Sequence, residues 1–344
     1  MSKVMVRVSR HEDPLLEILG HGRAGPQRRD RFTPGQIAQI ARTVRRAPEV
    51  MVKVTGGGRS TGAVAAHFAY ISGKGRIDIE TEEGQRIDKE GQKDFLKGWH
   101  LELTPGQYRK GSDDQHAPRP LKLAHNIVLS MPRPTPPDKV LAAARVFARE
   151  HFGAKHQYAM VLHTHQEHPH VHLVVKAEGR DGLRLHIDKA MLREWREHFA
   201  ELMRAQGVPA NATARVVRGR TKSRLKEASY QAMRRGRSDR LRARVYDVAR
   251  ELNSAKTIHD PAHARLLATR QAVVDGWIKV AAALDAQGEI VLAGDVRYFA
   301  KHLPPMLTDR ERLAAEFIRF VKTERCARTR GDDRVRDRTM ERTR

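Results

Sequence analysis

The sequence predicts an α+β fold in which helices pack against a mostly antiparallel sheet. Between residues 50 and about 217, short aliphatic runs alternate with segments of helical hydrophobic spacing. Two of these runs, 157–163 and 170–177, are separated by only a short polar connection, which is typical of an antiparallel hairpin. Together these observations indicate one layered domain, followed by a basic helical C-terminal part.

The first elements of this domain are a strand, a loop, a helix and a hairpin. VMVKV (50–54) is rich in β-branched residues, and GGGRS (56–60) has the composition of a loop. TGAVAAHFAYI (61–71) is expected to form a short helix that places Tyr70 at its end. The polar stretch RIDIETEEGQRI (76–87) is expected to form a hairpin.

The second half of the domain supplies the central strands and two longer helices. AHNIVLSM (124–131) is predicted to be a buried strand that ends at PRPTPP. The residues at 138–152 have amphipathic spacing, and 188–207 form a second predicted helix. Asp188 is the expected N-cap of that second helix, and Gly207 is its expected C-terminal stop.

Composition shifts divide the chain into four expected regions. Residues 1–48 form a basic N-terminal arm with a short helix at 34–46, and residues 49–217 form the α+β domain. Residues 218–325 are basic with helical patterns, whereas residues 326–344 lack apolar periodicity and are expected to be disordered.

Charge favours a polyanionic partner. The 65 Lys and Arg residues outnumber the 41 Asp and Glu residues, giving a formal net charge of +24. Such a balance favours nucleic acid through phosphate contacts and counterion release. No apolar run reaches the length of a membrane-spanning helix, and the first residues lack the apolar core of a signal peptide, so we expect a cytoplasmic protein without membrane insertion. The single cysteine, Cys326, excludes an internal disulfide and a cysteine-based zinc site.

The most informative stretch is the histidine cluster at 163–172, which holds five of the 18 histidines. Strand side chains alternate between faces, so His170 and His172 are expected to point the same way while the residues between and after them face the core. His163, at the end of the preceding strand, is a candidate third ligand for a metal ion with open coordination positions. A purely structural tris-histidine site, or metal affinity without function, remains the alternative.

Three motifs resemble those of a known family. HTHQEHPHVHLVV (163–175) is similar to the histidine-hydrophobic-histidine motif of HUH endonucleases, specifically of conjugative relaxases of the plasmid-mobilisation (MOBP-like) class that includes the T-DNA border endonuclease. VMVKVTGGGRSTGAVAAHFAYISGKG (50–75) and AHNIVLSMP (124–132) resemble the first and second motifs of that family. Their order and spacing agree, and the resemblance covers roughly residues 50–210. It implies an HUH/relaxase-type central antiparallel sheet flanked by helices, with residues 49–217 as the nuclease domain.

The resemblance also implies a mechanism and site residues. Tyr70 would be the nucleophile that forms a 5′-phosphotyrosyl bond with DNA, although a tyrosine at a helix end can equally be a packing residue. A bound divalent ion would neutralise charge on the scissile phosphate, and we expect the protein to use Mg²⁺ or Mn²⁺. Ser130, Lys74 and Arg76 are candidate DNA contacts, though an ordinary strand-end serine and plain surface charge explain them as well.

Two positions depart from the family pattern. His165 stands where relatives often have an aspartate, and it is a candidate general base or an alternative metal ligand. Lys176 stands where relatives often have asparagine, and it could add a phosphate contact. Neither change removes Tyr70 or the His170 and His172 pair.

The function implied is site- and strand-specific nicking and rejoining of DNA at an origin of transfer, on the single-stranded nic region. The same resemblance implies two kinds of partner, relaxosome accessory proteins and a type IV coupling protein. It also implies that the protein is exported with the DNA through a type IV secretion system. The alternatives are a replication-initiator-type HUH nuclease, which the order of tyrosine before histidines disfavours, and a non-enzymatic basic DNA-binding protein.

Overall fold

The computed structural model describes residues 31–103, 121–166, 168–220, 239–254, 261–315 and 318–319. The chain divides into two compact units, one of residues 41–212 and one of residues 1–40 with 213–344. The regions expected to be an arm before residue 31 and a tail at 326–344 lie outside the described residues. Among the described helices, none is long and apolar enough to cross a membrane.

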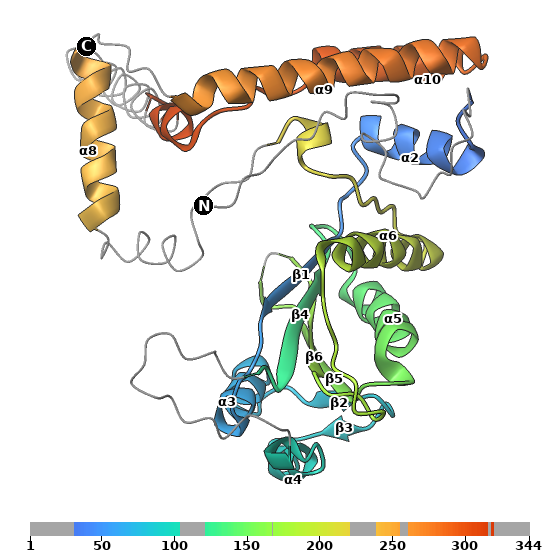
Figure 1. The fold of residues 1–344 in the computed structure, drawn as a ribbon, viewed down its shortest axis with the longest axis vertical. Helices are drawn as coiled ribbons and strands as arrows, with labels where there is room; N and C mark the ends of the chain where they lie inside the picture. Colours follow the sequence, from blue (N-terminus) through green and yellow to red (C-terminus); the bar gives the residue numbers. More distant parts are fainter. Residues whose placement is uncertain are drawn as a thin grey trace, which may run out of the picture. The chain divides into compact units, whose positions relative to one another are not determined.

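The first unit is built on a six-stranded sheet with the order β1-β4-β6-β5-β2-β3 (Figure 1). All neighbouring strands pair antiparallel, which confirms the predicted α+β class. The strands are β1 (Met51–Gly56), β2 (Ile79–Thr81), β3 (Arg86–Ile87), β4 (Ala124–Ser130), β5 (Tyr158–His163) and β6 (His170–Lys176). The expected hairpins at 76–87 and at 157–177 are both present, as β2 with β3 and as β5 with β6.

Helices cover both faces of this sheet, as Figure 1 shows. On one face, α5 (Pro137–Ala148) and α6 (Lys189–Ala205) pack over alternate residues of the central strands. On the other face, α3 (Thr61–Ile71) and the short α4 (Gln92–Lys97) cover the remaining alternate residues. Val171 belongs to the first core and Val174 to the second, as the two-residue period of a strand requires.

Local sequence signals explain where the helices begin and end. Ser60 caps α3 by accepting a hydrogen bond from the Ala63 amide at 3.2 Å. Asp188, the predicted N-cap of α6, accepts one from the Met191 amide at 2.8 Å. Gly207 follows α6 with a φ of 77°, the left-handed conformation that glycine adopts without strain.

Two parts of the first unit differ from the sequence prediction. The helix expected over 138–152 is α-helical only to Ala148 and continues as a π-helical turn, Arg149–Gly153. The sequence predicts no helix or strand between residues 88 and 103, yet this stretch contains α4 and a 3-10 turn, Leu101–Leu103. Both elements are too short to give a recognisable hydrophobic period.

The second unit is helical in its described residues. Its elements are α8 (Asp239–Ser254), α9 (Pro261–Ala286) and α10 (Ile290–Lys301), with α2 (Pro34–Val44) crossing the division between the units. Trp277 of α9 is buried, packs edge-to-face on Phe299 at 5.2 Å, and donates its indole N–H to the Val217 carbonyl at 2.8 Å. The helical patterns expected within 262–322 therefore include a packed pair, α9 and α10.

Candidate active site

Three histidines meet at one end of the central strands. His163, the last residue of β5, pairs directly with His170, the first residue of β6, and His172 follows two residues later on the same face. One ring nitrogen from each of these three side chains lies within 4.8 Å of the others. Among the described residues, this is the one group of histidine, cysteine or carboxylate side chains with such spacing.

Backbone carbonyls fix which nitrogen of two of these rings can bind a metal ion. A carbonyl oxygen only accepts, so His170 donates its Nδ1–H to the His168 carbonyl at 2.9 Å, and its Nε2 is left as the lone-pair nitrogen. His163 likewise donates its Nε2–H to the Ile71 carbonyl at 2.5 Å, which leaves Nδ1. Such carbonyl bonds are the usual orienting contacts of metal-binding imidazoles.

The electrostatics of the cluster favour the neutral form of His163 and His172. Burial, followed by the neighbouring His163 and His170, lowers the pKa of His172 to about 3. Burial also lowers the pKa of His163 below its ordinary value. Neutral imidazole is the ligand form, so the lowered pKa values of His163 and His172 favour binding of a divalent ion.

Tyr70 lies beside this cluster, on the last turn of α3. Its side chain is 67% exposed, and its ring lies edge-on to His172 with centroids 6.4 Å apart. The residue after Tyr70 is Ile71, whose carbonyl receives the His163 hydrogen bond. The helix that carries the tyrosine is therefore fixed directly to one of the three histidines.

The turn after Tyr70 is organised by Ser72, which is fully buried. The Ser72 hydroxyl accepts from the Gly75 amide at 3.1 Å, and Gly73, Lys74 and Gly75 all have positive φ. A Cβ on Gly75 would lie 2.4 Å from a side-chain carbon of Lys89. Glycine at this position therefore serves both the backbone conformation and the close packing of the turn.

The predicted DNA contacts lie in different environments. Lys74 and Arg76 are exposed in the turn that follows Tyr70, and Arg76 donates to the Gly73 carbonyl at 2.9 Å. Ser130 is buried and donates its hydroxyl to the Pro169 carbonyl at 3.2 Å, next to His170. Its hydroxyl thus anchors the turn that leads into β6, while a DNA contact by Ser130 stays a prediction.

His165 lies next to the cluster but outside the group of three. Its side chain is exposed, and its ring centroid lies 4.9 Å from that of His163. The geometry favours His163 over His165 as the third metal ligand. A role for His165 as a base stays a prediction.

Sequence reasoning missed His67, which lies one helical turn before Tyr70. Its ring stacks on Tyr70 with centroids 6.1 Å apart and lies edge-on to His172 at 6.3 Å. Its Nε2 is buried with no hydrogen-bond partner among the described residues, and burial lowers the pKa of His67. The three-residue spacing from Tyr70 on a predicted helix was the signal that could have identified it.

The strands that carry the three histidines lie in a stretch that is similar to a known family. Residues 110–208 match the family model described as the MobA/VirD2-like relaxase, nuclease domain. This stretch of the chain is similar to a relaxase nuclease domain. The matched range includes the three histidines and Ser130, while Tyr70 precedes it.

The curated relatives that the chain resembles are T-DNA border endonucleases. The chain is 26% identical over 212 residues to the T-DNA border endonuclease VirD2 of Agrobacterium fabrum (strain C58 / ATCC 33970), an alignment that covers 57% of this chain and 46% of the relative. It is also 26% identical over 189 residues to VirD2 of Rhizobium rhizogenes, covering 51% and 42%. The chain thus spans about half the length of the curated relatives it matches.

Two solved structures are similar to the chain at low identity. The MobM relaxase domain, solved with manganese and bound to plasmid oriT DNA, is 12% identical, with a TM-score of 0.36 and coverage of 54% of this chain and 98% of that chain. A structure reported for the molecular basis of vancomycin resistance transfer in Staphylococcus aureus is 13% identical, with a TM-score of 0.33 and coverage of 48% and 98%.

Proposed function

We propose that this chain is a DNA relaxase that nicks and rejoins one DNA strand through a covalent bond to Tyr70. The observation that carries the proposal is the contact of an exposed tyrosine with His172, one of three histidines grouped on the sheet. The similarity of residues 110–208 to a relaxase nuclease domain supports it, as do the relatives named T-DNA border endonuclease. The net charge of +24 suits a DNA substrate.

Each of these residues would have a separate role in the reaction. His163, His170 and His172 would hold a divalent ion, Mg²⁺ or Mn²⁺, which when bound neutralises charge on a phosphate oxygen. The exposed Tyr70 hydroxyl gives its proton to a base and its oxygen attacks phosphorus, the bond from phosphorus to the 3′-oxygen breaks, and the leaving 3′-oxygen takes up a proton to become the 3′-hydroxyl. The result is a 5′-phosphotyrosyl bond whose energy supports the reverse reaction, so the same site can rejoin DNA without ATP.

The phenol must lose its proton during the attack, because tyrosine at its reference pKa of about 10 is a weak nucleophile at neutral pH. The sequence predicts His165 as the base, and its ring lies next to that of His163. His67 is the second candidate, because its ring contacts Tyr70 itself. The exposed Lys74 and Arg76 follow Tyr70 in the chain and would contact the DNA backbone.

The wider biological role follows from the family. The substrate would be the single-stranded nic region of an origin of transfer, and partners would include accessory proteins and a type IV coupling protein. An initiator-type nuclease would share the chemistry but act at a replication origin. A non-enzymatic DNA-binding protein would share only the charge.

A denaturing gel that detects covalent protein–DNA adducts tests the proposal. The full chain is incubated with Mn²⁺ or Mg²⁺ and single-stranded oligonucleotides tiled across the DNA that flanks its own gene. We expect one oligonucleotide to give an adduct that is lost with a chelator and in Tyr70→Phe. Tyr298→Phe is the matched control, because Tyr298 is also 67% exposed, and it should retain the adduct. An adduct that survives Tyr70→Phe would refute the assignment of the nucleophile, and salt-sensitive binding with no adduct at any site would favour the non-enzymatic alternative.

A further inference from the structure

A row of paired residues joins the histidine site to the edge strand β1. Lys53 of β1 pairs with Val128 of β4, and Val128 pairs with His172 of β6. Residues that pair directly in antiparallel strands project on the same face of the sheet, so these three side chains form one row. Lys53 therefore lies two strand spacings from His172, a distance of about 10 Å across the sheet.

The β1 end of this row is accessible. Val52 is buried in the core on the opposite face of the sheet, whereas Lys53 is exposed and Met51 is 40% exposed. The core beneath α3 and α4 takes its buried strand residues from β2, β4, β5 and β6, and none from β1. The described helices thus leave Lys53 and Met51 open on the face that carries the three histidines.

The charge of this face fits a phosphate backbone. Lys53 is the one Lys, Arg, Asp or Glu residue of β1, and β4 and β5 contain none. Its ammonium group takes part in no ion pair among the residues that the structure describes. Because lysine has a flexible four-carbon stem, this ammonium group can reach over Val128 toward the histidine site.

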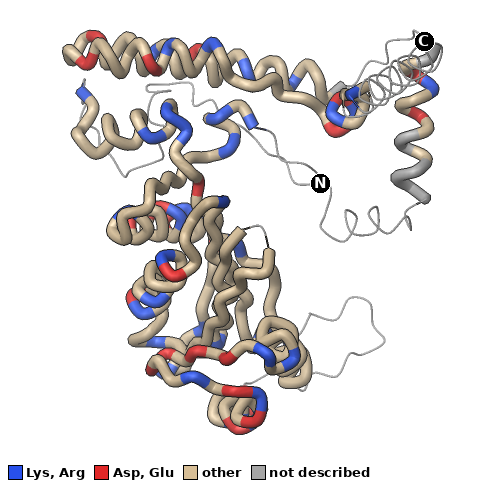
Figure 2. The backbone as a smooth tube through the Cα atoms, turned by 180° about the vertical axis from the view of Figure 1, so that it is seen from behind, with Lys and Arg blue, Asp and Glu red and all other residues tan. Residues whose placement is uncertain are grey.

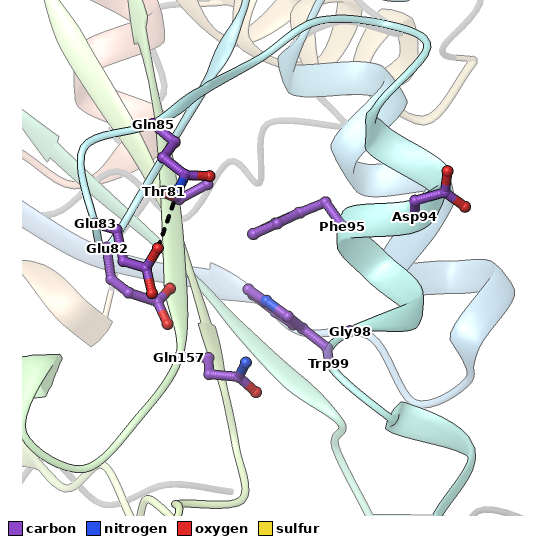
Figure 3. A pocket seen from close by; sticks show the side chains of 9 residues that line it. All are labelled: Thr81, Glu82, Glu83, Gln85, Asp94, Phe95, Gly98, Trp99 and Gln157. Atoms are coloured by element: carbon purple, nitrogen blue, oxygen red, sulfur yellow. Dashed lines mark hydrogen bonds between the residues drawn. The ribbon is translucent and has the colours of Figure 1, made fainter.

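The opposite edge of the sheet is acidic. The β2–β3 hairpin and α4 enclose a pocket of about 220 Å³ whose lining includes Glu82, Glu83 and Asp94 (Figure 3). Glu82 and Asp94 are in ion pairs with Arg180 and Lys97, but Glu83 is in none among the described residues. Figure 2 shows the acidic residues of the hairpin beside those of α4. Carboxylates repel phosphates, so a DNA strand that leaves the histidine site is expected to cross β1 and not β3.

We propose that the exposed face of β1 binds the backbone of the DNA strand next to the cleaved phosphate, with Lys53 contacting one phosphate of that strand. The row of paired residues places this contact away from the reacting atoms, so Lys53 is a positioning residue. Sequence reasoning predicted Lys74 and Arg76 as DNA contacts and missed Lys53, which lies on a different element. That the bound strand is the cleaved one rests on the proposed function.

A cross-linking experiment tests whether DNA reaches this face. The chain has a single cysteine, so Cys326→Ser allows one thiol to be placed at a chosen position. Lys53→Cys is compared with Lys189→Cys, because Lys189 is exposed at the start of α6, which covers the opposite face of the sheet. Both chains also carry Tyr70→Phe, which removes the proposed nucleophile. The probe is a dT oligonucleotide of about 20 nucleotides with bromoacetamide groups attached to its backbone through phosphorothioates.

We expect the thiol of Lys53→Cys to react with this probe at least about fivefold faster than that of Lys189→Cys, because bound DNA raises the local concentration of the reactive group. Each rate is first divided by the rate with free bromoacetamide, which corrects for the intrinsic reactivity of the thiol. Excess unmodified dT oligonucleotide should abolish the difference. Equal corrected rates would overturn the proposal.

The kinetics of nicking test the role of the charge. On the oligonucleotide that forms the Tyr70 adduct, Lys53→Met should lower the rate of adduct formation about tenfold at limiting DNA, because one charged hydrogen bond is lost. At saturating DNA the rate should change by less than about threefold, since Lys53 binds the strand and takes no part in the chemical step. Lys53→Arg should retain the rate, and Lys189→Met is the matched control that should leave it unchanged.

Two results of the kinetic experiment would contradict the positioning role. A tenfold loss that persists at saturating DNA would place Lys53 in the chemical step. An unchanged rate at limiting DNA, accompanied by aggregation of Lys53→Met, would show that this lysine only prevents the edge strand from pairing with another chain.

The two experiments separate failure of this proposal from failure of the proposed function. Faster cross-linking of Lys53→Cys, with no adduct on any oligonucleotide, would support DNA binding by β1 and refute nicking. An adduct at Tyr70 without faster cross-linking would overturn this proposal alone.

Discussion

At the scale of single residues, the site depends on backbone carbonyls that orient side chains. The Ile71 and His168 carbonyls each take one N–H of a histidine and leave the opposite nitrogen for a metal ion. Because Ile71 follows Tyr70 directly, the contact that orients His163 also positions the proposed nucleophile. His165 has an adjacent ring but lies outside the group of three.

This difference predicts unequal effects of two neighbouring substitutions on metal binding. His163→Ala should weaken Mn²⁺ binding by more than about tenfold, because it removes a ligand, and His165→Ala should change it by less than about threefold. Isothermal titration of the purified chain with Mn²⁺ measures both. Equal losses in the two variants would show that His165 is a ligand too.

At the scale of elements, the hydrophobic pattern predicted the features that neighbouring residues determine, such as hairpins and the face on which a side chain lies. The β5–β6 hairpin and the shared face of His170 and His172 followed from a two-residue period and a short connection. The pairing of β1 with β4 and of β5 with β2 joins distant segments, so no local pattern contains it. The helix α4 was missed because six residues give no period, although it forms one wall of the pocket in Figure 3.

The cap of α6 gives a prediction at this scale. Asp188→Ala should lower the free energy of unfolding of the first unit by about 1 kcal/mol, because the Met191 amide loses its acceptor. Asp188→Asn keeps an acceptor and should change stability by only a few tenths of that value. Urea unfolding measures both, and equal losses would show that the charge of Asp188, and not its capping bond, stabilises the helix.

At the scale of the whole molecule, buried neutral histidines make the fold sensitive to acid. Burial, followed by the charge of Lys122, lowers the pKa of His125 to about 4 from its ordinary value of 6.5, and His172 is shifted in the same direction. Between pH 6.5 and 4 the unfolded chain binds a proton at His125 that the folded chain does not. The contribution of His125 to the free energy of unfolding is therefore fully present above pH 6.5, and it is lost as the pH falls toward 4.

The prediction is a free energy of unfolding that decreases from pH 6.5 to pH 4, by at most about 1.4 kcal/mol per pH unit for each such histidine. Urea unfolding with a chelator present, so that no metal ion contributes, measures this slope. His125→Asn should flatten it, whereas substitution of the exposed His302 should not. A slope unchanged in His125→Asn would contradict the assigned role of this buried imidazole.

The central claim is that Tyr70 forms the covalent bond with the 5′ end of the cleaved strand. Tryptic digestion and mass spectrometry of the protein–DNA adduct, after nuclease trimming, test it most directly. The account predicts a nucleotide joined through a 5′-phosphate to Tyr70, within the tryptic peptide of residues 60–74. A nucleotide attached to any other residue, or joined through its 3′ end, would contradict it.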